Sequence, residues 1–409
     1  MEIHDLVDFR YENSVVIVTT DDTVVEHDFF PNRKCSFYLN FRKFPIQNQG
    51  VIKQFRDGFR QDFYLENIIN ELLPQQFQSS TASWAYNLFL TALGIARAET
   101  LGAKEVYIPN SFFTGIVQSE FYKKLNTLID EGTNKHTQIE IKPSLSKGIA
   151  KPSHLVSQLE NKSLILASGG TDNTVAATIE KKLGRSIGLL QVIYQQAARH
   201  QERWCIDRLK EDLDAIELKR IEFDVLKHYG GSALLRDDIQ LKEGNLELEY
   251  VPFRNSIFIT LGLILASSKD YSSIVLGAHP DDTMAPDGTR SYIQAFNDVL
   301  KAFIFDTPEI RAPLLNFGGK PELIELGIDL GVNFKHTWSC HTYVPKTDVG
   351  YNAKACGTCG NCITRYSAFK KLGLEDPVGY IEEPKLRTKW AGKQEDYDNL
   401  RKILLLSNS

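Results

Sequence analysis

A strand at 162–168, a glycine pair and a helix follow one another, and this unit constrains the fold more than any other feature. The run KSLILAS is short and apolar, and an apolar periodic stretch begins at Val175. A buried strand that turns tightly into a helix is the building unit of α/β folds. Later runs alternate in the same way, with SIGLLQVIY and SIVLG as strands and ERWCIDRLKEDLDAI and SYIQAFNDVLKAF as helices. We therefore predict an α/β domain with a doubly wound, mostly parallel sheet.

The first 150 residues predict a separate N-terminal α+β extension. SVVIVTT, TVVEHDF and CSFYLNF alternate apolar and polar residues, which favours a few antiparallel strands. The pattern becomes helical from Phe63 to about Ala103 and ends in the strand EVYIP. Segment 130–155 is polar and contains Pro and Gly, so we predict a linker between an extension at 1–150 and a second domain at 155–409.

One internal similarity joins the two parts. Residues 88–108 resemble residues 257–277, and each segment is an apolar helix leading into a strand. Either the extension is a degenerate copy of the second unit, or any buried helix before a strand looks this way.

The net charge of the chain restricts the classes of partner that it is expected to bind. A formal net charge of −5 gives no overall attraction to nucleic acid or anionic lipid, so we expect neither as a partner. The N-terminus MEIHDLVDFRYENS has no leader pattern and no stretch reaches membrane-spanning length, so we expect a cytoplasmic protein without a membrane partner.

The glycine pair lies where a phosphate would bind. In LILASGGTDNT the glycines allow close backbone approach, and the amides of the first helical turn point toward the ligand. The hydroxyls of Ser168 and Thr174 can add hydrogen bonds, and Asp172 can hold Mg²⁺ bound to phosphates. The lysine and spacing of a Walker A loop are missing. We predict a pyrophosphate site, the alternative being a glycine-rich turn without a ligand.

Four of the six cysteines cluster near the C-terminus, at Cys340, Cys356, Cys359 and Cys362. Closely spaced thiolates favour metal ligation in a chain without a secretion signal, and four sulfurs form the closed shell of a structural zinc site. An iron–sulfur cluster is the competing interpretation, although no Cys-Pro follows the triplet and the fourth cysteine is upstream.

These motifs resemble a known family. The glycine loop is similar to the SGGxDS signature of PP-loop ATP pyrophosphatases, except that Asn173 replaces the serine. Further segments resemble, in order, those of the QueC family: YQQAARH from Tyr194, GGSALL at 230–235, VPFRNSIF at 251–258, GAHPDDTMAPD at 277–287, PLLNFGGK ending at Lys320, and ACGTCGNCITRYSAFKKLGLEDP at 355–377. The family's Tyr-Gly-Gln lacks its glycine here, so Gln195 or Gln196, with His200, are the equivalents.

The resemblance implies the fold, the ligands and the site residues. The fold is that of the adenine-nucleotide alpha-hydrolases, with a zinc knuckle at 340–362. Lys320 would neutralise the departing pyrophosphate, Arg254 and Asn255 would serve the substrate, and Asp287 would recognise the base. The implied ATP site is Ser168, Gly169, Gly170, Thr171, Asp172, Asn173 and Thr174; the substrate site is Tyr194, Gln195, Arg254, Asn255, Asp282 and Asp287; and the catalytic residues are Asp172, Lys320 and Arg254.

The resemblance also implies a reaction. QueC-like enzymes transfer AMP from ATP to the carboxylate of 7-carboxy-7-deazaguanine and let an amine displace it, with structural Zn²⁺ and with Mg²⁺ bound to ATP. The extension, Asn173 and the altered Tyr-Gln-Gln segment favour the longer members of antiphage defence operons, of the QatC or type IV CBASS kind. There the implied acceptor is the N-terminus of a partner protein encoded in the same operon. By analogy with the family, a homodimer is also an option.

Three alternatives stay open. The chain could be a housekeeping 7-cyano-7-deazaguanine synthase that uses ammonia for the queuosine pathway. It could be a tRNA-modifying PP-loop enzyme, although a basic face and a catalytic cysteine pair would then be expected. It could also be a non-catalytic scaffold, for which Asn173 is the only reason in the sequence.

Overall fold

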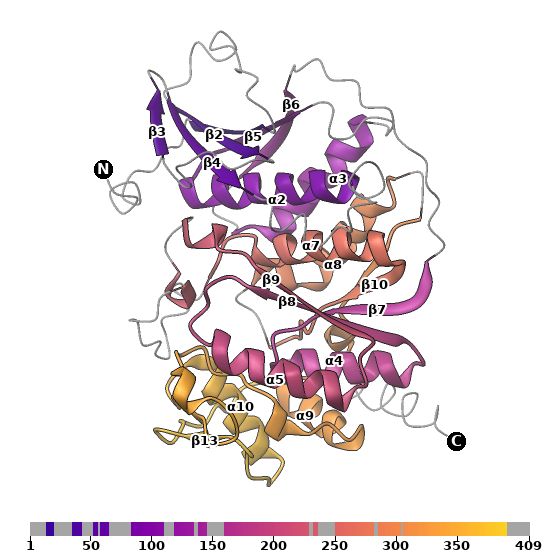
Figure 1. Cartoon of the computed structure of the whole chain (residues 1–409), viewed down its shortest axis with the longest axis vertical. Helices are drawn as coiled ribbons and strands as arrows, with labels where there is room; N and C mark the ends of the chain where they lie inside the picture. Colours follow the sequence, from indigo (N-terminus) through magenta and orange to yellow (C-terminus); the bar gives the residue numbers. More distant parts are fainter. Residues whose placement is uncertain are drawn as a thin grey trace.

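In the computed structural model, two mainly parallel sheets are stacked with two layers of helices between them (Figure 1). The indigo N-terminal sheet lies at one end of the molecule, and the yellow C-terminal segment lies at the other. The structure describes residues 14–19, 35–42, 52–55, 58–64, 83–109, 118–134, 138–144, 159–228, 232–235, 250–281, 285–303 and 306–390.

The second sheet has five described strands in the order β11-β10-β7-β8-β9, and all of its pairings are parallel. Helices α7 and α8 cover one face, while α4, α5 and α9 lie on the other (Figure 1). The predicted doubly wound α/β domain is therefore confirmed. The strands are β7 (Glu160–Leu166), β8 (Ser186–Ile193), β9 (Glu217–Glu222), β10 (Tyr271–Val275) and β11 (Glu309–Arg311), and the helices are α4 (Thr171–Lys182), α5 (Arg199–Asp212), α7 (Arg254–Lys269), α8 (Arg290–Leu300) and α9 (Lys320–Asp329).

The N-terminal sheet corrects one prediction. Its described strands run β3-β4-β2-β1-β5-β6, and every pairing is parallel except that of β3 with β4. The predicted antiparallel arrangement is therefore wrong, because alternation of apolar residues specifies a strand and its buried face but not its direction. The strands are β1 (Ser14–Thr19), β2 (Cys35–Arg42), β3 (Ile52–Phe55), β4 (Gly58–Tyr64), β5 (Glu105–Pro109) and β6 (Glu140–Ser144).

Two boundaries also differ from the sequence interpretation. Phe63 and Tyr64 end strand β4, so the helical region starts later, and helix α2 spans Ser83–Leu101. The expected linker at 130–155 begins inside helix α3 (Gln118–Gly132) and includes β6. Residues 65–82 and 145–158 lie outside the described residues.

The two units repeat one arrangement. The order β4-β2-β1-β5-β6 matches β9-β8-β7-β10-β11, and α2, β5, α3 and β6 follow one another as α7, β10, α8 and β11 do. Helix α2 packs on α7 and α3 packs on α8 (Figure 1). This arrangement supports the interpretation of the extension as a degenerate copy of the second unit.

A buried apolar seam joins the units. The ring of Phe89 in α2 lies 5.8 Å from that of Phe223, and Trp84 lies 4.9 Å from Phe303. The packing is also close at Gly132, where an added Cβ would lie 2.7 Å from the ring of Phe253. Burial of this much aromatic surface favours a fixed association of the two units.

The yellow C-terminal segment packs beside α5 and α9 (Figure 1). It contains β12 (Lys354–Ala355), α10 (Gly360–Lys371) and β13 (Gly379–Tyr380). Among the helices that the structure describes, none combines the length and the hydropathy of a membrane span.

Candidate functional site

The predicted phosphate loop connects β7 to α4 at the carboxyl end of the second sheet. Gly169 has a φ of 75°, and a Cβ there would lie 2.8 Å from Cβ of Cys205 in α5, so both backbone conformation and space require glycine. Gly170 precedes the first turn of α4 and makes no side-chain cap. The first amides of α4 are therefore available to an anion, as the sequence predicts.

The side chain of Asn173 holds the loop closed. Its Nδ2 donates to the carbonyl oxygen of Leu166 at 2.6 Å and to Oγ of Ser168 at 3.0 Å. Thr174 donates its hydroxyl to the carbonyl oxygen of Gly170 at 2.9 Å, and Thr171 is fully buried. Asn173, which stands where the family signature has serine, thus stabilises the loop through two hydrogen bonds. The Thr174 hydroxyl is directed into the helix.

Asp172 and Lys320, which lie 148 positions apart in the sequence, form an ion pair at this loop. His279 follows strand β10, and its Nε2 lies 3.6 Å from the second carboxylate oxygen of Asp172. Burial alone would raise the pKa of Asp172, but the Lys320 ammonium and His279 outweigh it and lower the pKa. Asp172 is therefore an anion at neutral pH and suits a magnesium ligand.

A second carboxylate fixes the position of Lys320. Asp281 accepts a hydrogen bond from the backbone N–H of Lys320 at 2.7 Å, and its other oxygen accepts one from Arg387 at 3.1 Å. The Asp281 side chain is fully buried. The start of α9 is thereby tied both to the segment after β10 and to the C-terminal segment.

The altered Tyr-Gln-Gln segment forms a turn after β8. Gln195 has a φ of 65°, so it occupies the left-handed conformation that a glycine adopts readily. The hydrogen bonds of this turn are made by the side-chain amide of Gln196. The Gln196 Oε1 accepts from the Tyr194 N–H at 2.9 Å, and its Nε2 donates to Glu202 at 2.6 Å. Arg254 donates to the Tyr194 hydroxyl at 3.2 Å and lies 5.9 Å from its ring centre. The predicted substrate residues Tyr194 and Arg254 are therefore brought together.

Asn255 and Asp287 also meet, at the start of α7. The Asp287 carboxylate accepts from the Asn255 N–H at 2.7 Å and from its Nδ2 at 3.2 Å, and Asp287 is 2% exposed. The carboxylate thus caps α7, and recognition of a base by Asp287 stays a prediction. The ring of His200 lies 6.2 Å from that of Tyr343. Asp282 lies outside the described residues.

The four clustered cysteines converge, and their ligand atoms all lie within 4.8 Å of one another. The Sγ atoms of Cys359 and Cys362 are 3.4 Å apart, and those of Cys356 and Cys362 are 3.8 Å apart. Zn–S bonds of about 2.3 Å in a tetrahedron place sulfurs about 3.8 Å apart, so the donor set fits zinc. Hydrogen bonds with Cys340 and Cys356 raise the pKa of the Cys359 and Cys362 thiols.

The cysteine segment is connected to the phosphate loop. The buried guanidinium of Arg365 donates to Asp376 at 2.9 Å and to the Thr337 hydroxyl at 2.9 Å. The backbone N–H of Trp338, the next residue, donates to the carbonyl oxygen of Gly169 at 2.8 Å. A metal at the cysteines would therefore steady the segment that supports the loop.

Several residues of this site were missed from the sequence: His279, Asp281, Glu202 and Arg387. His279 and Asp281 were detectable, since polar residues at the carboxyl ends of parallel strands gather at one edge of a sheet.

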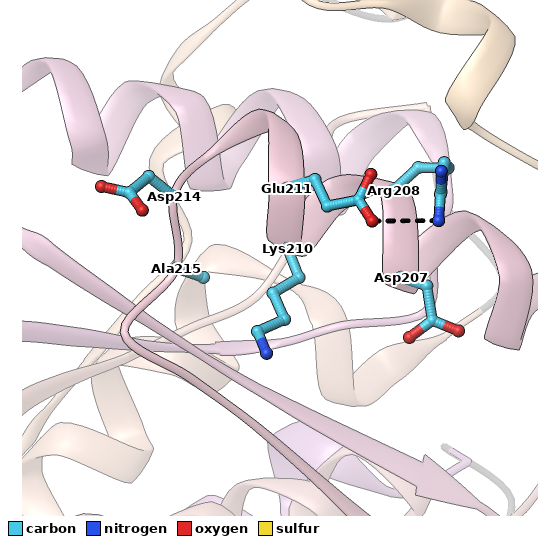
Figure 2. Close-up of a pocket in the computed structure, with 6 residues that line it drawn as sticks. All are labelled: Asp207, Arg208, Lys210, Glu211, Asp214 and Ala215. Atoms are coloured by element: carbon cyan, nitrogen blue, oxygen red, sulfur yellow. Dashed lines mark ion pairs between the residues drawn. The ribbon is translucent and has the colours of Figure 1, made fainter.

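A hollow of about 410 Å³ lies at the C-terminal part of α5 and is lined by Asp207, Arg208, Lys210, Glu211, Asp214 and Ala215. Figure 2 shows these side chains, and none of the predicted site residues is among them.

Comparison with known proteins assigns the second unit. The family described as "Queuosine biosynthesis protein QueC" matches residues 162–373, slightly more than half of the chain. A 7-cyano-7-deazaguanine synthase of Halobacterium salinarum is 32% identical over 231 residues, which are 54% of this chain and 97% of that protein. Another from Methanosphaerula palustris is 34% identical over 229 residues, covering 54% of this chain and 100% of that protein.

A solved structure, described as a predicted subunit of tRNA methyltransferase from Methanocaldococcus jannaschii, is similar at 19% identity with a TM-score of 0.30. It covers 57% of this chain and 96% of that chain, and a likeness this slight carries no weight beside the family match. The chain belongs to the QueC family.

Proposed function

We propose that this chain transfers AMP from ATP to the carboxylate of 7-carboxy-7-deazaguanine and then joins the acyl group to an amine. The observation that carries this proposal is the Asp172–Lys320 ion pair beside the glycine loop. A cation and a magnesium-binding carboxylate are needed together where pyrophosphate separates from AMP. The amides of the loop and of the first turn of α4 would hold the pyrophosphate.

The residues around the loop have distinct roles in this proposal. Lys320 stabilises the charge that develops on pyrophosphate, and Asp172 holds the Mg²⁺ that ATP carries. Arg254, supported by Tyr194, binds the substrate carboxylate or the phosphate that replaces it. Asp287 and Asn255 bind the purine-like edge. Mg²⁺, when bound, neutralises phosphate charge.

The acceptor is proposed to be the N-terminal amine of a partner protein in an antiphage defence system. The support is the N-terminal unit, which lies outside residues 162–373 and packs through α2 on α7, the helix that begins at Arg254, and through α3 on α8. Such a unit could dock a protein but is not needed to admit ammonia. The alternative is the ammonia-using synthase, which the relatives' names favour.

Two further alternatives have less support. A tRNA-modifying PP-loop enzyme with a catalytic cysteine pair would need reactive thiols, but burial raises the pKa of Cys205 to about 12, and the other cysteines whose side chains are described form the cluster. A scaffold would not need the ion pair of Asp172 with Lys320.

The test has two parts. Purified protein with ATP, Mg²⁺ and 7-carboxy-7-deazaguanine should release pyrophosphate, and omission of the deazaguanine should abolish the release. Co-expression with the neighbouring operon protein should then add the deazaguanine mass to the partner's N-terminal peptide. An unmodified partner together with free nitrile product would assign the ammonia reaction instead. If the protein released no pyrophosphate at all, the non-catalytic scaffold would be the remaining interpretation.

A further inference from the structure

Glu202, in the first turn of α5, is a carboxylate for which the adenylation step has no use. Its carboxylate oxygen Oε2 accepts from Gln196 Nε2 at 2.6 Å, while Oε1 accepts no hydrogen bond from a described residue and is not sealed from solvent. Its backbone carbonyl oxygen would lie 3.1 Å from a Cβ at Gly169, so the residue borders the phosphate loop. One carboxylate oxygen is thus fixed by Gln196, and the other is available on a residue that borders the phosphate loop.

The surroundings of Glu202 come from four elements. Arg254 of α7 and His341 act on it electrostatically, Tyr194 at the end of β8 lies in the same cluster, and Cys205 is on its own helix. Burial raises the pKa of Glu202, although the Gln196 hydrogen bond and the charges of His341 and Arg254 oppose that shift. A carboxylate with a raised pKa is a stronger base than an ordinary surface glutamate.

The other described carboxylates of the site already pair with, or accept hydrogen bonds from, other groups of the protein. Asp172 pairs with Lys320 and has a lowered pKa, which makes it a weak base. Both oxygens of Asp281 are hydrogen-bonded, to Lys320 and Arg387, and the Asp287 carboxylate caps α7. Glu202 alone among these four combines an available oxygen with a position at the loop.

We propose that Glu202 is the general base that removes the proton from the attacking amine, an inference that rests on the proposed function. The neutral amine nitrogen forms the C–N bond at the acyl carbon of the adenylate, and its proton passes to Oε1 of Glu202. The C–O bond to AMP then breaks, and AMP leaves with the electron pair on its phosphate oxygen. The first step, from ATP to adenylate and pyrophosphate, needs no proton acceptor, because the attacking carboxylate is already an anion.

The two steps can therefore be separated experimentally. Glu202→Gln keeps the shape and the hydrogen-bonding oxygen but removes the base. The adenylation step is followed as pyrophosphate–ATP exchange with 7-carboxy-7-deazaguanine and no amine. The amide step is followed by single-turnover quench with ammonia as the probe, and again with hydroxylamine, whose less basic nitrogen loses its proton to water more readily once the C–N bond has formed. Glu211→Gln is the matched control, since Glu211 lies on the same helix in an exposed ion pair with Arg208 (Figure 2).

In Glu202→Gln we expect exchange within about twofold of wild type and amide formation with ammonia slowed by about 100-fold or more. The defect should be much smaller with hydroxylamine, and the control should match wild type in every assay. An unchanged amide step would overturn the proposal. So would an equal fall in both steps, because Glu202 would then only brace the turn at Gln196. Absence of exchange in the wild-type protein would instead refute the proposed function itself.

Discussion

Gly277 offers a sharp test of the site, because it lies where strand β10 meets the phosphate loop. A Cβ at this position would lie 2.6 Å from the backbone nitrogen of Asn173 and 2.8 Å from the backbone carbon of Asp172. An ordinary contact is about 3.5 Å, so Gly277→Ala forces the start of α4 to retreat by close to 1 Å. The side-chain Oδ1 of Asn173 would lie closer still, but hydrogen bonds to Leu166 and Ser168 hold that side chain, and the two backbone atoms cannot rotate away.

That displacement should affect catalysis more than folding. A misplacement of about 1 Å costs roughly 100-fold in rate, which corresponds to about 2.7 kcal/mol of transition-state stabilisation. Overpacking costs about 1–3 kcal/mol of folding free energy, which leaves the protein folded. We therefore expect kcat/KM for pyrophosphate release to fall about 100-fold while the melting temperature falls by a few degrees.

The assay follows pyrophosphate release with ATP and 7-carboxy-7-deazaguanine, together with thermal unfolding by circular dichroism. Gly379→Ala is the control, since a Cβ there meets only the Lys354 side chain at 3.7 Å, and it should behave as wild type. Wild-type activity and stability in Gly277→Ala would show that the loop is not held against β10 as described.

Four further outcomes are expected. Lys320→Met removes the main counter-ion of Asp172 and should reduce pyrophosphate release by about 100-fold or more, measured at saturating ATP. Cys359→Ala should abolish bound zinc, measured by elemental analysis, and lower the melting temperature; an unchanged metal content would refute the site. Arg365→Ala leaves a buried carboxylate unpaired and should cost about 3–5 kcal/mol in urea unfolding. Burial raises the pKa of Glu99 to about 7, so the folded state holds its proton where the unfolded chain releases it. Wild-type stability should therefore fall from pH 5 to pH 7, and Glu99→Gln should flatten that decline in unfolding titrations.

Local patterns in the sequence were enough to specify the second unit. The run KSLILAS followed by two glycines predicts β7, the loop and α4. A buried strand requires a short apolar run and a positive φ favours glycine, so both can be recognised from a few neighbouring residues. The clustering of Cys340 with Cys356, Cys359 and Cys362 predicts their convergence, because thiolates gathered in this way favour one shared metal ion. The parallel strands of the N-terminal sheet could not be recognised in this way, since residue alternation carries no strand direction.

The family resemblance places Asp172 and Lys320 in one site, but only the tertiary structure shows which distant side chains touch there. Lys320 pairs with Asp172, and Arg387 donates to Asp281, although the residues of each pair are more than 100 positions apart. The available oxygen of Glu202 likewise depends on how α5 packs against the loop at Gly169. Contacts of this kind arise from the order of strands in the sheet and the packing of helices on it, and no local pattern of residue types encodes them.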